Sequence, residues 1–204
     1  MEGVMDYLRA VFAMLGESTA PAEGSARQWR ALEARLGTGL PDDYKAVVDA
    51  YAGHVPYAPV QMNGHLYLVS PDEGLAEYIE RVVEEFRDAS WRDDVACPGF
   101  ERTGPRFGGA AGMIPLADTD RGDYVFSVRE PDTGAWRILT CDGDEQDFHE
   151  YRMSFAEWLH GYLVGGDMIG PGSSVFYPGP VRMERWSRVR GERPLVWHGP
   201  DRGR

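Results

Sequence analysis

Residues 29–53 read "WRALEARLGTGLPDDYKAVVDAYAG", and the pattern predicts two short helices joined by a glycine-containing turn. Apolar residues in the first half recur at the spacing of one helical face until glycines interrupt them. Pro41 then suits the first turn of a second helix, because the N–H that proline lacks has no helical partner there. We expect this second helix to pack its apolar stripe on a sheet. The stripe consists of Tyr44, Val47, Val48 and Tyr51.

Two aromatic residues of this stretch are expected in the core, and two acids are expected at the surface. Trp29 and Tyr44 each lie on the apolar face of their helix, so we expect both rings to be buried. Asp42 and Asp43 follow Pro41 in the first turn, where the positive end of the helix dipole stabilises carboxylates. The dipole alone explains these acids, although they could also belong to a recognition surface.

The rest of the chain combines helix and strand patterns. Asn63 and Gly64 separate two apolar runs, as in a tight β-hairpin. Ser70 as cap and Pro71 at the first helical position predict the start of an amphipathic helix with apolar residues from Leu75 to Phe86, and four short strand-like runs separated by turns lie within 113–151. Ser154 then begins a last helix. The sequence therefore predicts an α+β fold, a single domain with a central antiparallel or mixed sheet flanked by helices.

Both ends of the chain are predicted to be additions to this domain. Residues 1–24 indicate an N-terminal helix extension, and residues 25–166 carry the α+β domain. Residues 167–204 form a Gly/Pro/Arg-rich C-terminal extension, a composition typical of loops. A freely solvated tail would not need large apolar residues, so we expect this one to fold back on the domain. The candidate anchors are Phe176, Trp186 and Trp197.

The protein carries a net charge of −12, and this charge is unevenly distributed. Seven arginines and three acids within residues 182–204 give +4, so residues 1–181 carry −16. An acidic body repels nucleic acid and membrane surfaces and attracts cationic partners, and it also serves solubility. The charge pattern therefore argues against a nucleic-acid or membrane partner.

Targeting signals and cysteine spacing indicate the cellular compartment of the protein. No stretch approaches the roughly 18 apolar residues of a membrane span. The opening sequence "MEGVMDYLRA" places acids before any base and lacks the layout of a signal peptide. Cys97 and Cys141 are far apart and match no metal or redox spacing, so reduced thiols are expected. These features predict a cytoplasmic protein.

The sequence lacks the short motifs that carry a strong prediction of chemistry. It has no H-E-x-x-H, no P-loop, no G-x-S-x-G and no paired cysteine motif. "FGGAAG", residues 107–112, precedes a strand pattern instead of joining a strand to a helix, which argues against a phosphate cradle. "DTDRGD", residues 118–123, gathers three aspartates that could bind Ca²⁺, but it lacks EF-hand spacing. We therefore predict no enzyme, no metal site and no cofactor.

Three segments together resemble the SUKH superfamily, the immunity-protein superfamily that also includes a fungal cell-wall-assembly regulator. The stretch at 29–53 resembles the opening signature of that superfamily. "GMIPLADTDRGDYVF" at 112–126 resembles its central strand segment, and "SFAEWLHGYLVGG" at 154–166 resembles its terminal helix. The segments follow the family's own order across residues 25–166. The signature positions in the opening stretch are Trp29, Glu33, Leu40, Pro41, Tyr44 and Gly53.

The resemblance implies a non-enzymatic binding protein, an immunity protein that neutralises a cognate bacterial toxin by direct protein–protein association. A regulatory scaffold or adaptor for a cellular protein partner is the alternative, and a hydrolase with a carboxylate pair at Asp120 and Asp123 is a third hypothesis. An acidic surface suits a basic toxin, since complementary charge accelerates encounter. We expect partner binding at the 90–112 connection and the 117–123 turn, because loops tolerate variation that a core cannot. The candidate residues are Asp93, Asp94, Asp118, Asp120 and Asp123.

Overall fold

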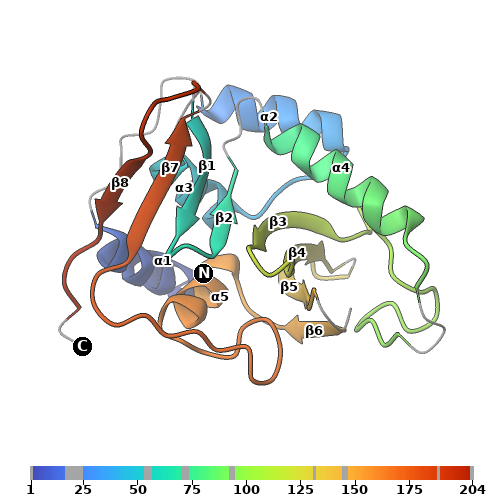
Figure 1. The fold of residues 1–204 in the computed structure, drawn as a ribbon. Coiled ribbons are helices and arrows are strands. Elements are labelled where there is room, and N and C mark those ends of the chain that lie inside the picture. The colour runs from blue at the N-terminus through green and yellow to red at the C-terminus, as the bar shows by residue number, and fades with distance from the viewer. Residues whose placement is uncertain are drawn as a thin grey trace.

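An antiparallel sheet of eight strands organises this computed structural model (Figure 1). The structure describes residues 2–16, 25–52, 57–69, 74–91, 95–130, 132–143, 147–187 and 189–202. Within these ranges the strand order is β6-β5-β4-β3-β2-β1-β7-β8, and every neighbouring pair is antiparallel. The strands are β1 (Tyr57–Met62), β2 (Leu66–Leu68), β3 (Ile114–Thr119), β4 (Tyr124–Arg129), β5 (Trp136–Cys141), β6 (Phe148–Tyr151), β7 (Arg182–Ser187) and β8 (Leu195–His198).

Helices flank the sheet on both faces, as the α+β prediction requires. Helices α1, α3 and α5 pack together on one face, while α4 crosses β3 and β4 on the other face with α2 beside it (Figure 1). Among the helices that the structure describes, none combines the length and the apolar character needed to cross a bilayer. The helices are α1 (Glu2–Leu15), α2 (Ser25–Leu36), α3 (Asp42–Tyr51), α4 (Leu75–Asp88) and α5 (Phe155–Leu163).

The predicted Asn63-Gly64 turn and Ser154 cap are confirmed, whereas the predicted cap at Ser70 lies outside the described residues. Asn63 and Gly64 have φ values of 52° and 81° in the turn that joins β1 to β2, a backbone that this pair of residues tolerates. Strands β3 to β6 form the predicted meander. The Ser154 hydroxyl caps α5 by accepting a hydrogen bond from the Glu157 N–H at 3.2 Å.

Trp29 and Tyr44 lie in the core, as predicted, with exposed fractions of 5% and 0%. Their rings meet edge to face with centroids 6.2 Å apart. The Trp29 indole N–H donates to Asp49 at 2.8 Å, so this residue joins α2 to α3. The Tyr44 hydroxyl donates to the Leu116 carbonyl at 3.0 Å, which joins α3 to β3. Together the two rings connect three elements.

The two acids at the start of α3 differ in their surroundings. Asp43 is buried, and its two carboxylate oxygens accept from the N–H groups of Tyr44 at 3.0 Å and Ala156 at 2.7 Å. Asp43 therefore ties the start of α3 to the first turn of α5, which corrects the expectation of a surface acid. Asp42 is the exposed member of the pair and forms an ion pair with Lys45 at 2.8 Å.

The C-terminal extension contains the predicted loops and, in addition, two strands that were not predicted. Strand β7 pairs with β1 and β8 pairs with β7, so the tail extends the sheet. The buried Arg185 of β7 donates to the Tyr51 carbonyl at the end of α3 and lies 5.3 Å from the centre of the Trp197 ring. Trp197 packs on the core, whereas Phe176 and Trp186 are 46% and 51% exposed. The tail is thus part of the sheet.

Candidate partner-binding site

The face of the sheet that carries α4 is divided into a covered half and an open half. The covered half comprises β3 to β6, over which α4 and the connection after it are packed. Phe86 of α4 approaches Tyr124 and Phe126 of β4 with ring centroids 4.8 and 5.2 Å apart, and Phe107 of the connection lies 5.7 Å from Phe126. The open half comprises β1, β2, β7 and β8, which no helix of the described chain crosses on this face (Figure 1).

A row of polar residues runs from the open half into the covered half. The strand register pairs Glu184 of β7 with Gln61 of β1, and Gln61 with Tyr67 of β2. It then pairs Tyr67 with Asp118 of β3, and Asp118 with Tyr124 of β4. Residues directly opposite each other on antiparallel strands share a face. These five side chains therefore form one line on the α4 side of the sheet, which we name the polar row.

Hydrogen bonds and an ion pair orient the side chains of the polar row. The Gln61 amide donates to the Tyr67 hydroxyl at 2.6 Å and to the Gly64 carbonyl of the hairpin turn at 2.7 Å. Glu184 is only 5% exposed and forms an ion pair with Arg182 of the same strand, so it anchors the end of the row and does not present a free carboxylate. Side chains that are ordered before binding lose less entropy when a partner arrives. These contacts hold the side chains of the row in place within the folded protein.

Asp118 lies where the open half meets the cover. Its carboxyl group is partly buried beside α4, and this burial raises its pKa from 3.8 to about 6, although Arg81 and Tyr78 act in the opposite direction. Burial first, and then nearby carboxylates including Asp118, also raise the pKa of Tyr67 and of Tyr124. The polar row is thus a region of negative potential with a partly desolvated carboxylate near its centre.

The turn between β3 and β4 contributes one exposed acid, Asp120, whose carboxylate is hydrogen-bonded to the ring of His65 in the β1–β2 turn. Asp123 was expected in the same surface, but the structure places it inside the turn. It is 8% exposed, and its carboxylate accepts from the Thr119 hydroxyl at 2.7 Å and from the Gly143 N–H at 3.1 Å. Asp123 therefore braces the turn and does not face a partner, because its oxygens are already engaged.

The described part of the 90–112 connection serves mainly as a cover for the sheet. Two of the candidate acids, Asp93 and Asp94, lie outside the described residues. From residue 95 onward the connection turns three side chains into the core, so this part of the connection has a structural role in addition to any recognition role. The three buried side chains are Cys97, Phe100 and Phe107.

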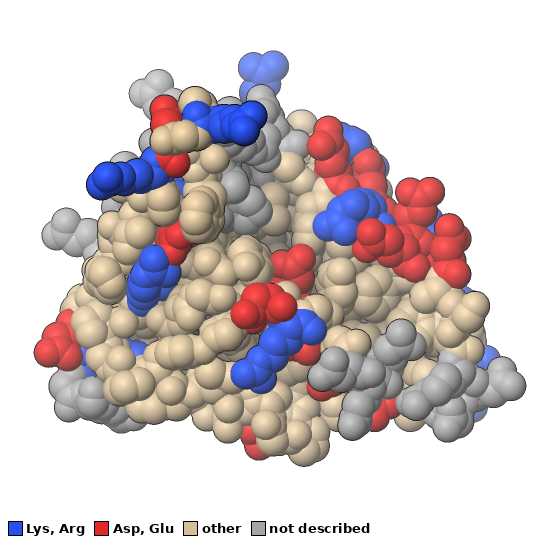
Figure 2. All heavy atoms as spheres, in the orientation of Figure 1, with Lys and Arg blue, Asp and Glu red and all other residues tan. Residues whose placement is uncertain are grey.

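The exposed face of α4 adds acids that the sequence analysis did not assign to a site. Figure 2 shows carboxylates gathered over this helix, beside those at the centre of the same face. They are interspersed with Arg81 and Arg87, which are also exposed. Acids at helical spacing opposite the apolar stripe were the available signal. The exposed acids of α4 are Glu77, Glu80, Glu84, Glu85 and Asp88.

Four members of the polar row were also missed by sequence reasoning, namely Gln61, Tyr67, Tyr124 and Glu184. Gln61 and Tyr67 each stand between two buried apolar residues, and this alternation could have placed both on the opposite face of their strands. Glu184 lies in the Gly/Pro-rich tail, where no comparable alternation indicated a strand. Its position beside Gln61 depends on a pairing between strands that are far apart in the sequence.

The arrangement offers charge and hydrogen bonds for binding. The described residues contain no group of three or more His, Cys, Asp or Glu side chains placed to hold a metal. Asp120 and Asp123, the pair considered for a hydrolase, do not converge, since Asp120 pairs with His65 and Asp123 points into its turn. Burial raises the pKa of the Cys97 and Cys141 thiols to about 12, which keeps them protonated at neutral pH.

The fold defines an α+β protein, and one face of its sheet carries the polar row. The chain belongs to the SMI1/KNR4 family (SUKH-1), whose family model matches residues 24–161. This match confirms the resemblance inferred from the sequence. The family includes immunity proteins and KNR4 regulators and is generally non-enzymatic. A search of curated proteins finds no relative of this chain. Strands β7 and β8, and with them Glu184, lie outside the matched residues.

Proposed function

We propose that this protein acts in the cytoplasm as an immunity protein that neutralises a cognate bacterial toxin by direct association. The observation that carries the proposal is the polar row, in which carboxylates and tyrosines are fixed side by side from the open half of the sheet to the edge of the covered half. Membership of the SMI1/KNR4 family supports a binding role of this kind. Binding alone would suffice for the function, without a cofactor.

Charge supports a cationic partner for this face. The protein carries a net charge of −12, and the exposed acids of α4 lie next to the polar row. Complementary charge can raise association rates toward about 10⁸ to 10⁹ M⁻¹s⁻¹ at low salt. A toxin that attacks nucleic acid needs a basic surface to contact phosphates. We therefore propose that an arginine- or lysine-bearing surface of the toxin docks on the polar row.

Asp118 would make binding selective for a cationic group, in addition to accelerating association. Its raised pKa means that the folded protein alone does not fully compensate the charge of this carboxylate. A guanidinium group beside Asp118 would provide that compensation through charge-assisted hydrogen bonds. Tyr67, paired with Asp118 across the strands, adds an aromatic surface and a hydroxyl at the same point. Tyrosine and arginine are among the residues that most often dominate interface energies.

A regulatory scaffold that binds a cellular protein is the alternative function. It would use the same face and the same charges, and the family includes both kinds of protein. The two functions differ in what the complex does for the cell. An immunity protein protects a cell that produces the toxin, whereas a scaffold gives no such protection.

Co-expression with the protein encoded beside it tests the proposal, with rescued growth and a co-purifying complex as the expected result. Binding kinetics of Asp118→Asn/Asp120→Asn then test the site. This double variant should slow association about ten-fold at low salt and flatten its salt dependence. The matched control is Asp6→Asn/Asp132→Asn, which removes the same charge at exposed positions outside the polar row. Thermal melting of both variants establishes that they are folded.

Two outcomes would count against the proposal in different ways. If the double variant at the polar row associates as fast as its matched control at every salt concentration, the row is not part of the interface. If the complex forms but growth is not rescued, the scaffold alternative is favoured over the immunity function.

A further inference from the structure

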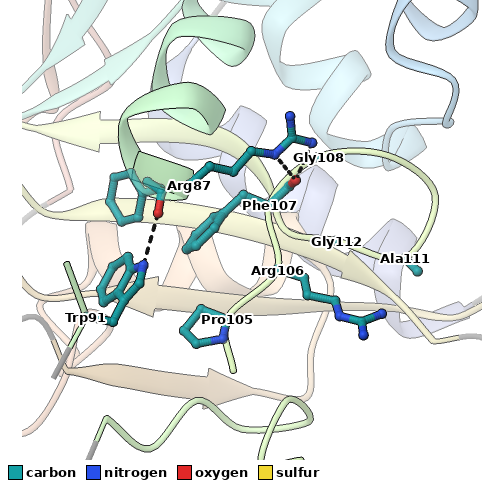
Figure 3. A pocket seen from close by; sticks show the side chains of 9 residues that line it. Arg87, Trp91, Pro105, Arg106, Phe107, Gly108, Ala111 and Gly112 are labelled. Carbon is teal, nitrogen blue, oxygen red and sulfur yellow. Dashed lines mark hydrogen bonds between the residues drawn. The ribbon is translucent and has the colours of Figure 1, made fainter. Parts of the chain in front are cut away.

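A pocket of about 420 Å³ lies between the end of α4 and the loop from Pro105 to Gly112 (Figure 3). None of the residues that line it belongs to the polar row. Its volume falls within the range of small-molecule sites, roughly 300 to 1,000 Å³. We name it the aromatic pocket, because three aromatic rings form one of its walls.

The aromatic wall is rigidly held. Trp91 and Phe107 are stacked, with ring centroids 5.7 Å apart and an interplanar angle of 17°. Phe86 lies 5.6 Å from Trp91, and the Trp91 indole N–H donates to the Phe86 carbonyl at 3.0 Å. A flat apolar group can pack against such a wall without rearranging it, which lowers the entropy cost of binding.

Among the described residues that line the aromatic pocket, the charged ones are both arginines, although the protein has a net charge of −12. Arg87 is held in place because its Nε and Nη2 donate to the Phe107 carbonyl at 3.0 and 2.8 Å. Arg106 is exposed and forms no ion pair within the described chain. Figure 3 shows the two guanidinium groups on opposite sides of the loop that carries Gly108 and Gly112. The pocket thus combines apolar rings with positive charge.

Gly108 allows the loop to pass close to α4. Its φ of +76° is rarely adopted by other residues, and a Cβ atom there would lie 2.9 Å from both the Val83 Cγ1 and the Arg87 Nη2. A larger residue would force the loop away from the helix. The narrow form of the pocket therefore depends on this glycine.

The same loop presents backbone N–H groups near the pocket. It is closed by the Met113 N–H, which donates to the Arg106 carbonyl at 2.8 Å. Within the part of the chain that the structure describes, the N–H groups of residues 109–112 donate no hydrogen bond, and Ala111 and Gly112 line the pocket. Successive N–H groups in a glycine-rich turn attract anions. This construction differs from the strand-loop-helix cradle that the sequence argued against.

We propose that the aromatic pocket binds a small anion whose charged group adjoins a flat apolar ring, such as an aryl phosphate or an aryl carboxylate. The ring packs against Trp91 and Phe107, and the anionic group contacts Arg106 and the N–H groups of the loop. This site is separate from the proposed toxin interface and does not depend on it.

Titration of the ¹⁵N-labelled full chain with phenyl phosphate and, in a second arm, with benzoate tests the proposal. Saturating chemical-shift changes are expected at the amides of residues 108–112 and at the Trp91 indole N–H. The stronger of the two probes indicates whether phosphate or carboxylate is the preferred anion. Inorganic phosphate has only the anionic group of phenyl phosphate, and phenol has only its ring. Each of these two controls should therefore bind at least about ten-fold more weakly than phenyl phosphate.

Three variants distinguish binding of the probe in the aromatic pocket from a general response to the charge of the protein. Arg106→Gln should weaken binding of the preferred probe about ten-fold without changing the melting temperature. Ala111→Asp, which adds a carboxylate at the exposed rim, should abolish binding. Arg102→Gln removes an exposed arginine of the same connection that does not line the pocket, so it should bind like the wild type.

Three results would overturn the proposal. The first is the absence of saturating shifts at the named groups with both probes. The second is equal affinity for inorganic phosphate and phenyl phosphate, since the rings would then contribute nothing. The third is an equal effect of Arg106→Gln and Arg102→Gln, which would indicate only a general response to charge.

Discussion

The covered half and the open half belong to one continuous set of paired strands but carry different side chains. In the covered half, Phe126, Leu139 and Phe148 face α4 and the connection, and each is at most 5% exposed. In the open half, Gln61 and Tyr67 occupy the same face and remain partly exposed. Antiparallel pairing is common to both halves. The facing side chains, and not the backbone, therefore distinguish the covered half from the open half.

The border between the two halves is the informative position. Asp123 is buried in its turn with its oxygens hydrogen-bonded, and Asp120 is exposed beside His65. Asp118 stands at the edge of the cover, where it loses water without being enclosed, and burial raises its pKa to about 6. A carboxylate in this state gains most from a cationic partner. Of the three carboxylates, Asp118 at the edge of the cover is therefore the one that a cationic partner would stabilise most.

Deleting residues 174–204 should have the largest effect, because it removes two strands of the open half. The edge of β1 would lose its partner β7, and the Tyr51 carbonyl would lose its hydrogen bond from Arg185. We expect loss of cooperative thermal unfolding, measured by circular dichroism, together with binding of a hydrophobic dye. Trp186→Ala is the control, since this exposed side chain should matter little. If the truncated chain melted like the full chain, the tail would not be needed for stability, which would contradict this prediction.

Phe126→Ala tests the covered half. The ring is 0% exposed and contacts Phe86 and Phe107, so its removal should lower the free energy of unfolding by about 3 to 5 kcal/mol. Val196→Ala, on an exposed position of β8 in the open half, should cost about 0.5 kcal/mol or less. Urea denaturation measures both values. Similar losses for the two variants would contradict the division of this face into two halves.

The elements that the sequence predicted correctly depend on interactions over a few residues. The Asn63-Gly64 turn and the Ser154 cap are local, so their sequence signals determine them without help from the rest of the fold. Strands β7 and β8 depend on pairing with β1, which is more than a hundred residues away. Tertiary context of this kind overrides a Gly- and Pro-rich composition, and it could not be inferred from the tail alone.

The candidate site was likewise predictable only where it depends on residues that are close in the sequence. Asp118 and Asp120 were expected in the 117–123 turn; Asp120 lies there and is exposed, whereas Asp118 lies near the end of β3 and is partly exposed. Asp123 is buried because it accepts a hydrogen bond from Gly143, a residue brought close by the meander. The polar row exists because register is maintained across five strands. Composition and spacing carry no information about such a register, so the row could be recognised only in the structure.

Asp118→Asn tests the carboxyl group at the border between the covered half and the open half. Burial raises the pKa of Asp118 from 3.8 to about 6, so the folded protein holds this proton more tightly than the unfolded chain. The wild type therefore loses stability as the pH rises through this interval, and the asparagine variant does not. We expect equal stability near pH 4 and a gain of up to about 3 kcal/mol for the variant at pH 7. Urea denaturation at the two pH values checks this, and a pH-independent difference would contradict it.

Gln61→Ala is expected to have the smallest effect, because it removes hydrogen bonds on the open half. Its amide donates to the Tyr67 hydroxyl and the Gly64 carbonyl, but water can replace it at this partly exposed position, so the loss should be below about 1 kcal/mol. Thr140→Val is the buried counterpart on the opposite face of the sheet. The Thr140 hydroxyl is 0% exposed and donates to the Ile169 carbonyl at 2.8 Å, so its loss should cost about 1 to 3 kcal/mol in urea denaturation. If Gln61→Ala cost as much as Thr140→Val, water would not reach Gln61 in solution. The open half would then be closed before any partner arrives, and the polar row could not be its binding site.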